Sequence, residues 1–205
     1  MPLPEDKRIN CLSCQYHCEI KSNSTIRMHN CFEDRYAIWP DKNLYLSIGV
    51  INRLIKRYHN FTHSGFIFVD FSYYNIREFT NYQWIEALAK SGMRLILISD
   101  QIMQPLATFW QQSYEKISCV INVTDDEEQI NKKISRAFNG HRDYAIAKNK
   151  LTSFEVAVLD LMMSEYSVVQ IADFLSVKDK KVYVAKRNLQ RKIGGRRRLH
   201  SILSI

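Results

Sequence analysis

Four of the five cysteines lie within the first 34 residues, close to two histidines, and these side chains are the candidates for metal chemistry. Cys11, Cys14, Cys18 and Cys31 would supply four thiolates, and a tetrahedral set of four is what structural Zn²⁺ sites use. Only Cys11 and Cys14 have a spacing that is common in zinc sites. The competing interpretation is that all four are ordinary thiols, exposed or partly buried. We therefore expect no cofactor and no metal, with zinc binding or redox sensing as the alternatives.

Positive charge gathers at the other end of the chain. Residues 151–205 hold ten lysines and arginines against five acids, which is +5 of the chain's net charge of +8. A local excess of cations is suited to binding a phosphate backbone. The competing interpretation is a solvated helix face, because runs of charge are common on helices.

Three amphipathic helices are predicted to position these cations. Thr152 with Glu155, and Ser167 with Gln170, each have the spacing of a capping box at the start of a helix. The turn Ser176-Val177 leads into a third helix over 179–192, whose apolar residues recur at spacings of three and four. They are Val182, Ala185, Leu189 and Ile193. The cations of this helix, Lys192 included, are expected to face outward or to lie at its margins. Gly194-Gly195 would end the helix, and a fourth short helix is predicted from Leu199, Ile202 and Leu203.

With these residues the segment resembles the LuxR-type (NarL/FixJ) helix-turn-helix module. The family's LTxxE motif corresponds to Leu151, Thr152 and Glu155, and its S-x-x-[EQ]-I-A motif to Ser167, Gln170, Ile171 and Ala172. The valine of its recognition helix corresponds to Val182, and its Lys-[LI]-Gly to Lys192, Ile193 and Gly194. The sequence departs from the family at Glu165, where glycine is usual, and at Lys178 and Leu199, where a Ser or Thr usually caps a helix. Because each lost cap costs about 1 kcal/mol, we expect a less stable module.

The resemblance implies that the third helix enters the major groove of double-stranded DNA. It places Tyr183, Val184 and Arg187 at base-facing positions, where Arg187 would read guanine and Val184 a thymine methyl. The candidate DNA contacts are Lys178, Lys180, Lys181, Tyr183, Val184, Lys186, Arg187 and Arg191. The resemblance also implies a homodimer on two half-sites, or a heterodimer with another LuxR-type regulator, acting on the transcription machinery.

The middle of the chain alternates between strand and helix patterns. Strands are predicted at 36–39, 66–71, 94–99 and 119–123. Helices are predicted over 43–58 and 103–112. Two more helices are predicted to start at capping boxes, one at Thr80 with Gln83 and one at Thr124 with Glu127, the latter ending at Asn139-Gly140. This alternation predicts a small parallel sheet wound by right-handed crossovers. The predicted fold class is an α/β N-terminal domain followed by an all-α, four-helix helix-turn-helix domain.

The α/β domain is similar to a degenerate receiver domain, the frequent partner of a LuxR-type module. Asp70 stands at the phosphoacceptor position and Ser99 at that of the switch Ser/Thr. Pro40 replaces one of the two acids beside Asp41, and Val123 or its neighbour stands where the receiver has a lysine. Aspartyl phosphorylation needs Mg²⁺ held by carboxylates and a lysine to balance the phosphate, so Asp70 is expected to be vestigial. The short stretch from Asp41 to Asp70 also predicts that one strand-helix unit is lost.

The expected organisation is an irregular cysteine-containing segment (1–34), a receiver-like domain (35–140), a linker (141–150) and the helix-turn-helix domain (151–205). The tripeptide His141-Arg142-Asp143 in the linker is interpreted as a chance match to a kinase motif, since no phosphate loop accompanies it. Apolar runs are too short to span a membrane and the N-terminus lacks a signal-peptide core, so a cytoplasmic protein without membrane contact is expected.

The resemblance, which extends to atypical LuxR-type regulators of fimbriae or capsule, implies a bacterial transcription regulator that aspartyl phosphorylation does not control. An auxiliary regulator acting by heterodimerisation, and a regulator sensing a ligand or metal, are the alternatives. An enzyme is not expected, because the sequence shows no pairing of a nucleophile with a base.

Overall fold

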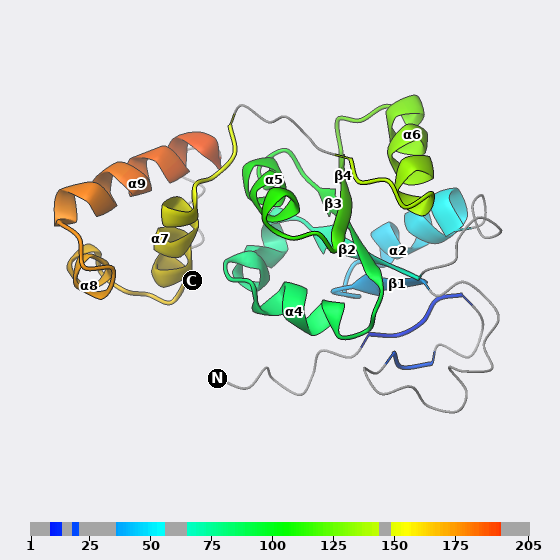
Figure 1. Ribbon diagram of the computed structural model, residues 1–205, viewed down its shortest axis with the longest axis horizontal. Coiled ribbons are helices and arrows are strands. Elements are labelled where there is room, and N and C mark those ends of the chain that lie inside the picture. Colours follow the sequence, from blue (N-terminus) through cyan, green and yellow to red (C-terminus); the bar gives the residue numbers. More distant parts are fainter. Residues whose placement is uncertain (1–8, 14–17, 21–35, 56–64, 144–148, 194–205) are drawn as a thin grey trace.

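The computed structural model describes residues 9–13, 18–20, 36–55, 65–143 and 149–193 of the chain. Within these residues the chain forms a sheet domain with helices on both faces and, after residue 149, a group of three helices beside it (Figure 1). The predictions for Cys14, Cys31, Gly194-Gly195 and the fourth helix around Leu199 lie outside the described residues.

The sheet has four parallel strands in the order β1-β2-β3-β4. These are β1 (Tyr36–Trp39), β2 (Phe66–Phe71), β3 (Arg94–Ser99) and β4 (Ile117–Asn122). The first three have the predicted bounds, whereas β4 begins two residues before the prediction. The strands are rich in β-branched and aromatic residues and are buried on both faces, as the near-continuous apolar runs indicated.

Alternate strand residues pack into separate cores on the two faces of the sheet. Tyr36 and Ile38 of β1 belong to the core that includes residues of α2 (Leu44–Val50), the π-helical turn η1 (Ile51–Ile55) and α6 (Glu127–Phe138). Ala37 and Trp39 belong to the core that includes residues of the 3-10 helix η2 (Tyr73–Phe79), α4 (Gln83–Ala89) and α5 (Gln104–Ser113). The sheet domain therefore has three layers, in agreement with the predicted α/β class.

The connection from β1 to β2 differs in hand from the other two. Each connection steps across the sheet in the same direction, but α2 packs on one face while α4 and α5 pack on the other. A connection that changes face without changing direction has the opposite hand, so the prediction of uniform right-handed crossovers is wrong. Among the described residues, the strand order is that of a doubly wound 2-1-3-4-5 sheet without its second strand, in agreement with the prediction from the short stretch between Asp41 and Asp70.

Two of the predicted helix starts are also wrong. α4 begins after Tyr82, which makes no side-chain cap, and Thr80 instead lies at the end of η2, a helix that was not predicted. α6 begins after Asp126, which forms a capping box with Gln129 in place of the predicted box at Thr124. The pattern S/T-x-x-E/Q is short, so it also occurs by chance in loops near a helix start.

The described part of the N-terminal segment covers the β1 edge of the sheet. Cys11 pairs antiparallel with Ala37, and the Leu12 N–H donates to the Tyr36 carbonyl at 2.7 Å. Asn10 pairs in turn with Glu19. These isolated bridges cover part of an otherwise open strand edge, within a segment that forms no named strand among its described residues.

The motif-like His141-Arg142-Asp143 has a structural role at the opposite edge. The Arg142 guanidinium donates to the carbonyls of Ile117, Tyr114 and Gln111, and the Asp143 N–H donates to the Ser118 carbonyl. These bonds join the start of the linker to the C-terminal end of α5 and to β4, the other edge strand of the sheet.

Candidate nucleic-acid interface

The C-terminal domain has the predicted helix-turn-helix. Its helices are α7 (Ser153–Met163), α8 (Val168–Phe174) and α9 (Asp179–Lys192). Both capping boxes are present, with Thr152 and Ser167 accepting from the backbone N–H of Glu155 and Gln170 at 3.2 and 3.3 Å. α9 begins without a side-chain cap at Lys178, as the departure from the family predicted.

Both helix-ending turns use a left-handed residue that is not glycine. Glu165 (φ 65) follows α7, and the N–H groups of Glu165 and Tyr166 donate to the carbonyls of Met162 and Leu161. Ser176 (φ 52) ends α8 in the same way. This is the Schellman arrangement, in which glycine is preferred because a Cβ is strained there. The departure at Glu165 therefore carries a conformational cost.

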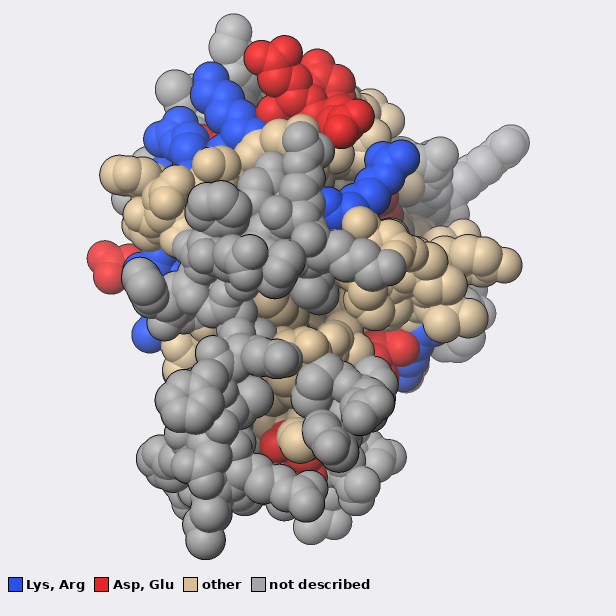
Figure 2. All heavy atoms as spheres, turned by 90° about the vertical axis from the view of Figure 1, so that its right-hand side faces the viewer, with Lys and Arg blue, Asp and Glu red and all other residues tan. Residues whose placement is uncertain are grey.

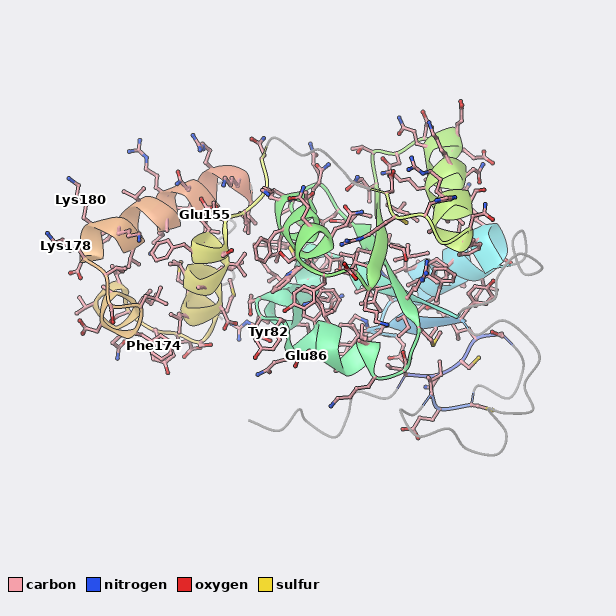
Figure 3. The ribbon with its side chains drawn as sticks, in the orientation of Figure 1. Tyr82, Glu86, Glu155, Phe174, Lys178 and Lys180 are labelled. Carbon is pink, nitrogen blue, oxygen red and sulfur yellow. The ribbon has the colours of Figure 1, made fainter. Side chains whose placement is uncertain are left out.

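α9 presents a basic and partly apolar face to solvent. Val182, Ala185 and Leu189 are buried against α7 and α8. The exposed residues include a set of candidate contacts, namely Lys178, Lys180, Lys181, Tyr183, Val184, Arg187 and Arg191, while Lys186 is half-buried. Tyr183 and Val184 are 59% and 53% exposed. In Figure 3, Lys178 and Lys180 project from the end of the domain that is farthest from the sheet domain.

One candidate cation is positioned by an aromatic ring. The Lys181 ammonium lies 4.6 Å from the centroid of the Phe154 ring of α7, within the range of a cation-π contact. This contact places the Lys181 ammonium beside α7.

Lys192 lies at the margin of α9, one of the two placements predicted for it, and its ammonium is paired rather than solvated. Its ammonium donates to Glu155 Oε2 at 2.7 Å and to the Lys150 carbonyl at 2.9 Å, with the side chain only 15% exposed. Burial acts to raise the pKa of the Glu155 carboxyl, but hydrogen bonds from Lys192 and Thr152 outweigh it and hold the pKa below its ordinary value. The last turn of α9 is thereby tied to the first turn of α7.

α7 also connects the two domains. Thr80 Oγ1 and Asn81 Nδ2 donate to Asp160 Oδ1 at 2.5 and 3.2 Å, and the Leu151 N–H donates to the Pro105 carbonyl at 3.3 Å. Buried apolar residues of the two domains belong to one continuous cluster. α9 lies across one end of α7 and extends to the side of the helical domain farthest from the sheet domain (Figure 1), and its candidate residues are mostly exposed in this arrangement.

The receiver-like positions have different surroundings. Asp70 is only 5% exposed, and its carboxylate accepts from Asn43 Nδ2 at 3.2 Å. The buried Ser99 donates its hydroxyl to the Asp100 carbonyl. Lys133 of α6 reaches β4, where its ammonium contacts Asp125 at 2.6 Å and donates to the Val120 carbonyl at 3.0 Å. No described contact links this lysine to Asp70.

The structure does not assemble a metal site from the described cysteines. Cys11 is buried, Cys18 is half-buried, and both are free thiols, while their two proposed co-ligands lie outside the described residues. Among the residues that the structure describes, no group of three potential ligands comes together. Burial raises the pKa of the Cys119 thiol to about 12, so this cysteine is inert at neutral pH.

This geometry defines the fold class first: an α/β sheet domain followed by a helix-turn-helix domain. Comparison with known families then matches residues 10–138 to the EcpR N-terminal domain. The chain therefore belongs to the EcpR N-terminal domain family. The match begins within the N-terminal segment, in keeping with the pairing of Cys11 on the sheet edge.

A curated relative covers nearly the whole chain. The uncharacterized protein YqeH of Escherichia coli K12 is 34% identical over 190 residues, which are 93% of this chain and 90% of the relative. Among solved structures, the chain is similar to an RcsB–DNA complex (17% identity, TM-score 0.37) and to RcsB from Salmonella enterica serovar Typhimurium bound to promoter rprA (18%, TM-score 0.34). Each alignment covers 77% of this chain and 81% of the other. Among the described helices, none has the length and apolar composition needed to cross a lipid bilayer.

Proposed function

We propose that this protein is a sequence-specific transcription regulator that binds double-stranded DNA through α9. The observation that carries the proposal is the exposed face of α9, where cations surround Tyr183, Val184 and Arg187 while the opposite face is buried. A capped α8, a tight turn and an exposed following helix form the arrangement that places a recognition helix in the major groove.

The residues of this face would have two roles. Arg187, Val184 and Tyr183 read base edges, Arg187 through the two acceptors of guanine and Val184 through a thymine methyl. The remaining cations neutralise phosphates and set the register of the helix on the duplex; they are Lys178, Lys180, Lys181, Lys186 and Arg191. Lys181 reaches the backbone from a position fixed by Phe154.

We further propose that aspartyl phosphorylation does not control the regulator. Support comes from the burial of Asp70, its hydrogen bond to Asn43 and the engagement of Lys133 with Asp125. A phosphoacceptor needs access to a phosphodonor, Mg²⁺ and a nearby cation. The protein would act in the bacterial cytoplasm as a dimer, in contact with the transcription machinery and without catalytic activity.

The proposal is tested by footprinting the wild-type protein across the genome of its host and measuring its binding to the recovered sites. A shared motif with two half-sites, bound at least about a thousandfold more tightly than unrelated DNA, is expected. Uniform binding without a motif would reject sequence-specific recognition. Motif binding that requires a second LuxR-type protein would replace the proposal with the auxiliary role.

A further inference from the structure

Two short extended pieces of the N-terminal segment lie beyond β1 at the edge of the sheet (Figure 1). The inner piece, residues 9–13, pairs antiparallel with β1, and the outer piece, residues 18–20, pairs antiparallel with the inner one. The bridge partners in the outer pairing are Asn10 and Glu19. Each step along one strand of an antiparallel pair is matched by a step back along the other, so this bridge fixes the partner of every residue in the outer piece.

Cys11 and Cys18 stand directly opposite each other in this register. The Cys11 N–H donates to the Cys18 carbonyl at 2.8 Å. Opposite residues of an antiparallel pair have Cα atoms about 4.5–5.5 Å apart, and their side chains point to the same face. A disulfide bond spans Cα separations of about 4.4–6.8 Å. The backbone therefore holds the two cysteines at a separation that a disulfide can bridge.

The face that the two cysteines share is the one covered by α4 and α5. Cys11 and Ile20 are buried in the core on that face, whereas Leu12 packs against the core on the other face. Cys18 lies two residues before Ile20 and so shares its face. Cys11 is 6% exposed and donates its thiol hydrogen to Ser13 Oγ at 3.5 Å, while Cys18 is half-buried. A small oxidant can therefore reach Cys18 first, with Cys11 held beside it.

The acidic residues described on this side of the molecule are concentrated elsewhere. Figure 2 faces the right-hand side of Figure 1 and shows acidic side chains gathered at its top, where α6 begins, whereas the two N-terminal pieces lie low in Figure 1. Glu19, the neighbour of Cys18 in the sequence, points to the opposite face of the outer piece. Oxidants react with the thiolate, which nearby cations favour and nearby acids disfavour. The cysteine pair thus lies apart from the acidic group over α6.

We propose that Cys11 and Cys18 form a reversible disulfide bond when the protein reacts with a peroxide. The Cys18 thiolate attacks one oxygen of hydrogen peroxide, breaks the O–O bond, releases hydroxide and becomes a sulfenic acid. The Cys11 thiolate then attacks the Cys18 sulfur, so that the S–S bond forms, the S–O bond breaks and a second hydroxide leaves. The two protons of the thiols convert both hydroxides to water, and two electrons pass from the thiols to one peroxide. Two equivalents of a small thiol reverse the reaction by exchange.

The bond would stabilise the cover over the β1 edge. Two strands paired by themselves are marginally stable in water, and an open strand edge can pair with another chain. A disulfide between Cys11 and Cys18 closes a short loop and so disfavours local opening of the two pieces. The inference does not depend on the proposed DNA binding, because α9 lies in the other domain.

The test uses the full-length protein, reduced, oxidised with hydrogen peroxide and then alkylated in urea. Trypsin releases residues 9–21 as one peptide, which contains Cys11, Cys14 and Cys18. Mass spectrometry is expected to find a single alkyl group on this peptide, on Cys14, and a bond between the other two cysteines. A bond through Cys14 or Cys31, or the same mixture of bonds as in protein oxidised in urea, overturns the inference. Thiols that react only after a chelator has removed a metal ion overturn it as well.

Two variants separate the pair from its neighbours. Cys14→Ser is the matched control and should form the bond as the wild-type protein does, so loss of the bond in this variant contradicts direct pairing. Hydrogen exchange measures the effect on the cover: oxidation should slow exchange of the Cys11 and Ile20 amides by roughly tenfold or more. Cys18→Ser should show no such slowing after the same treatment. Equal exchange in the reduced and the disulfide-bonded wild-type protein would reject the stabilising role.

Discussion

The C-terminal helices and the sheet domain both retain the positions of a known kind of site, but they differ in how accessible those positions are. The candidate residues of α9 are mostly exposed and surrounded by cations. Asp70 in the sheet domain is buried and hydrogen-bonded to Asn43, and Lys133 is paired with Asp125. A residue at the right position in a motif is functional only if its surroundings supply the access and charge that the chemistry needs.

The domains also differ in what holds them together. The sheet domain is stabilised by apolar residues on both faces of four paired strands. The small helical domain adds a buried ion pair between its first and last described helices. This difference predicts that polar substitutions in the helical domain have large effects on its stability.

The largest effect is expected from Lys192→Met. It leaves the Glu155 carboxylate buried without its cation, which should destabilise the helical domain by about 3 kcal/mol. The measurement is urea unfolding of the full-length protein. Arg191→Met, at the exposed neighbouring position, is the control and should change stability little. An equally small loss at Lys192 would show that the ion pair does not tie α9 to α7.

The same ion pair predicts a pH dependence. The pKa of Glu155 is lower in the folded state, so its ionised carboxyl stabilises the fold above its ordinary pKa of 4.5, and this contribution is lost as pH falls through the folded-state pKa. In urea unfolding the wild-type protein should exceed Glu155→Gln in stability at neutral pH, and the difference should shrink below pH 4.5. A difference that grows on acidification would contradict the assigned direction.

Asp160→Ala tests whether the two regions form one body. The substitution leaves the buried Thr80 hydroxyl without its acceptor, which should weaken the docked arrangement by about 1–2 kcal/mol. Small-angle X-ray scattering should then show a larger radius of gyration, with DNA affinity unchanged because α9 is open in either state. Asp173→Ala, at an exposed acid of α8, is the control. An unchanged radius would mean that the apolar contact is sufficient for docking.

A smaller, stabilising effect is expected from Glu165→Gly. The backbone at Glu165 is left-handed, and removing the Cβ should stabilise the helical domain by about 1 kcal/mol. Ser164→Gly is the comparison, because Ser164 has φ −88 and gains nothing from the change. The measurement is again urea unfolding, and equal effects at the two positions would remove backbone strain as the reason.

Much of this arrangement could be predicted from local sequence signals. Residue spacing predicts the bounds of α9 and the two capping boxes of the helical domain. Apolar runs predict the bounds of three of the four strands. The partner of Lys192 was not predicted, because Glu155 is 37 positions away and helical spacing alone identifies no long-range partner. Thr80 was predicted to be a helix cap from its spacing to Gln83. Its actual partner, Asp160, lies 80 positions away in the other domain, so the local sequence could not indicate it.

The N-terminal edge pairing and the hand of the β1–β2 connection could not be predicted for a related reason. Both depend on which element lies beside β1, and residues 9–13 carry no periodic pattern that distinguishes an edge strand from a loop. The preference for right-handed connections is strong but statistical. Among the described residues the second strand of the doubly wound order is absent, so the connection that normally follows β1 with the preferred hand is absent too.

The most direct test of the central claim, base reading by α9, compares Arg187→Ala with Lys180→Ala on a recovered operator and on unrelated DNA. Both residues are exposed on the same helix. In mobility-shift titrations Arg187→Ala should weaken operator binding by about 1–3 kcal/mol while changing binding to unrelated DNA much less. Lys180→Ala should weaken both DNAs alike and lower the salt dependence by about one ion. Equal losses on the two DNAs for Arg187→Ala would contradict the claim that this helix reads sequence.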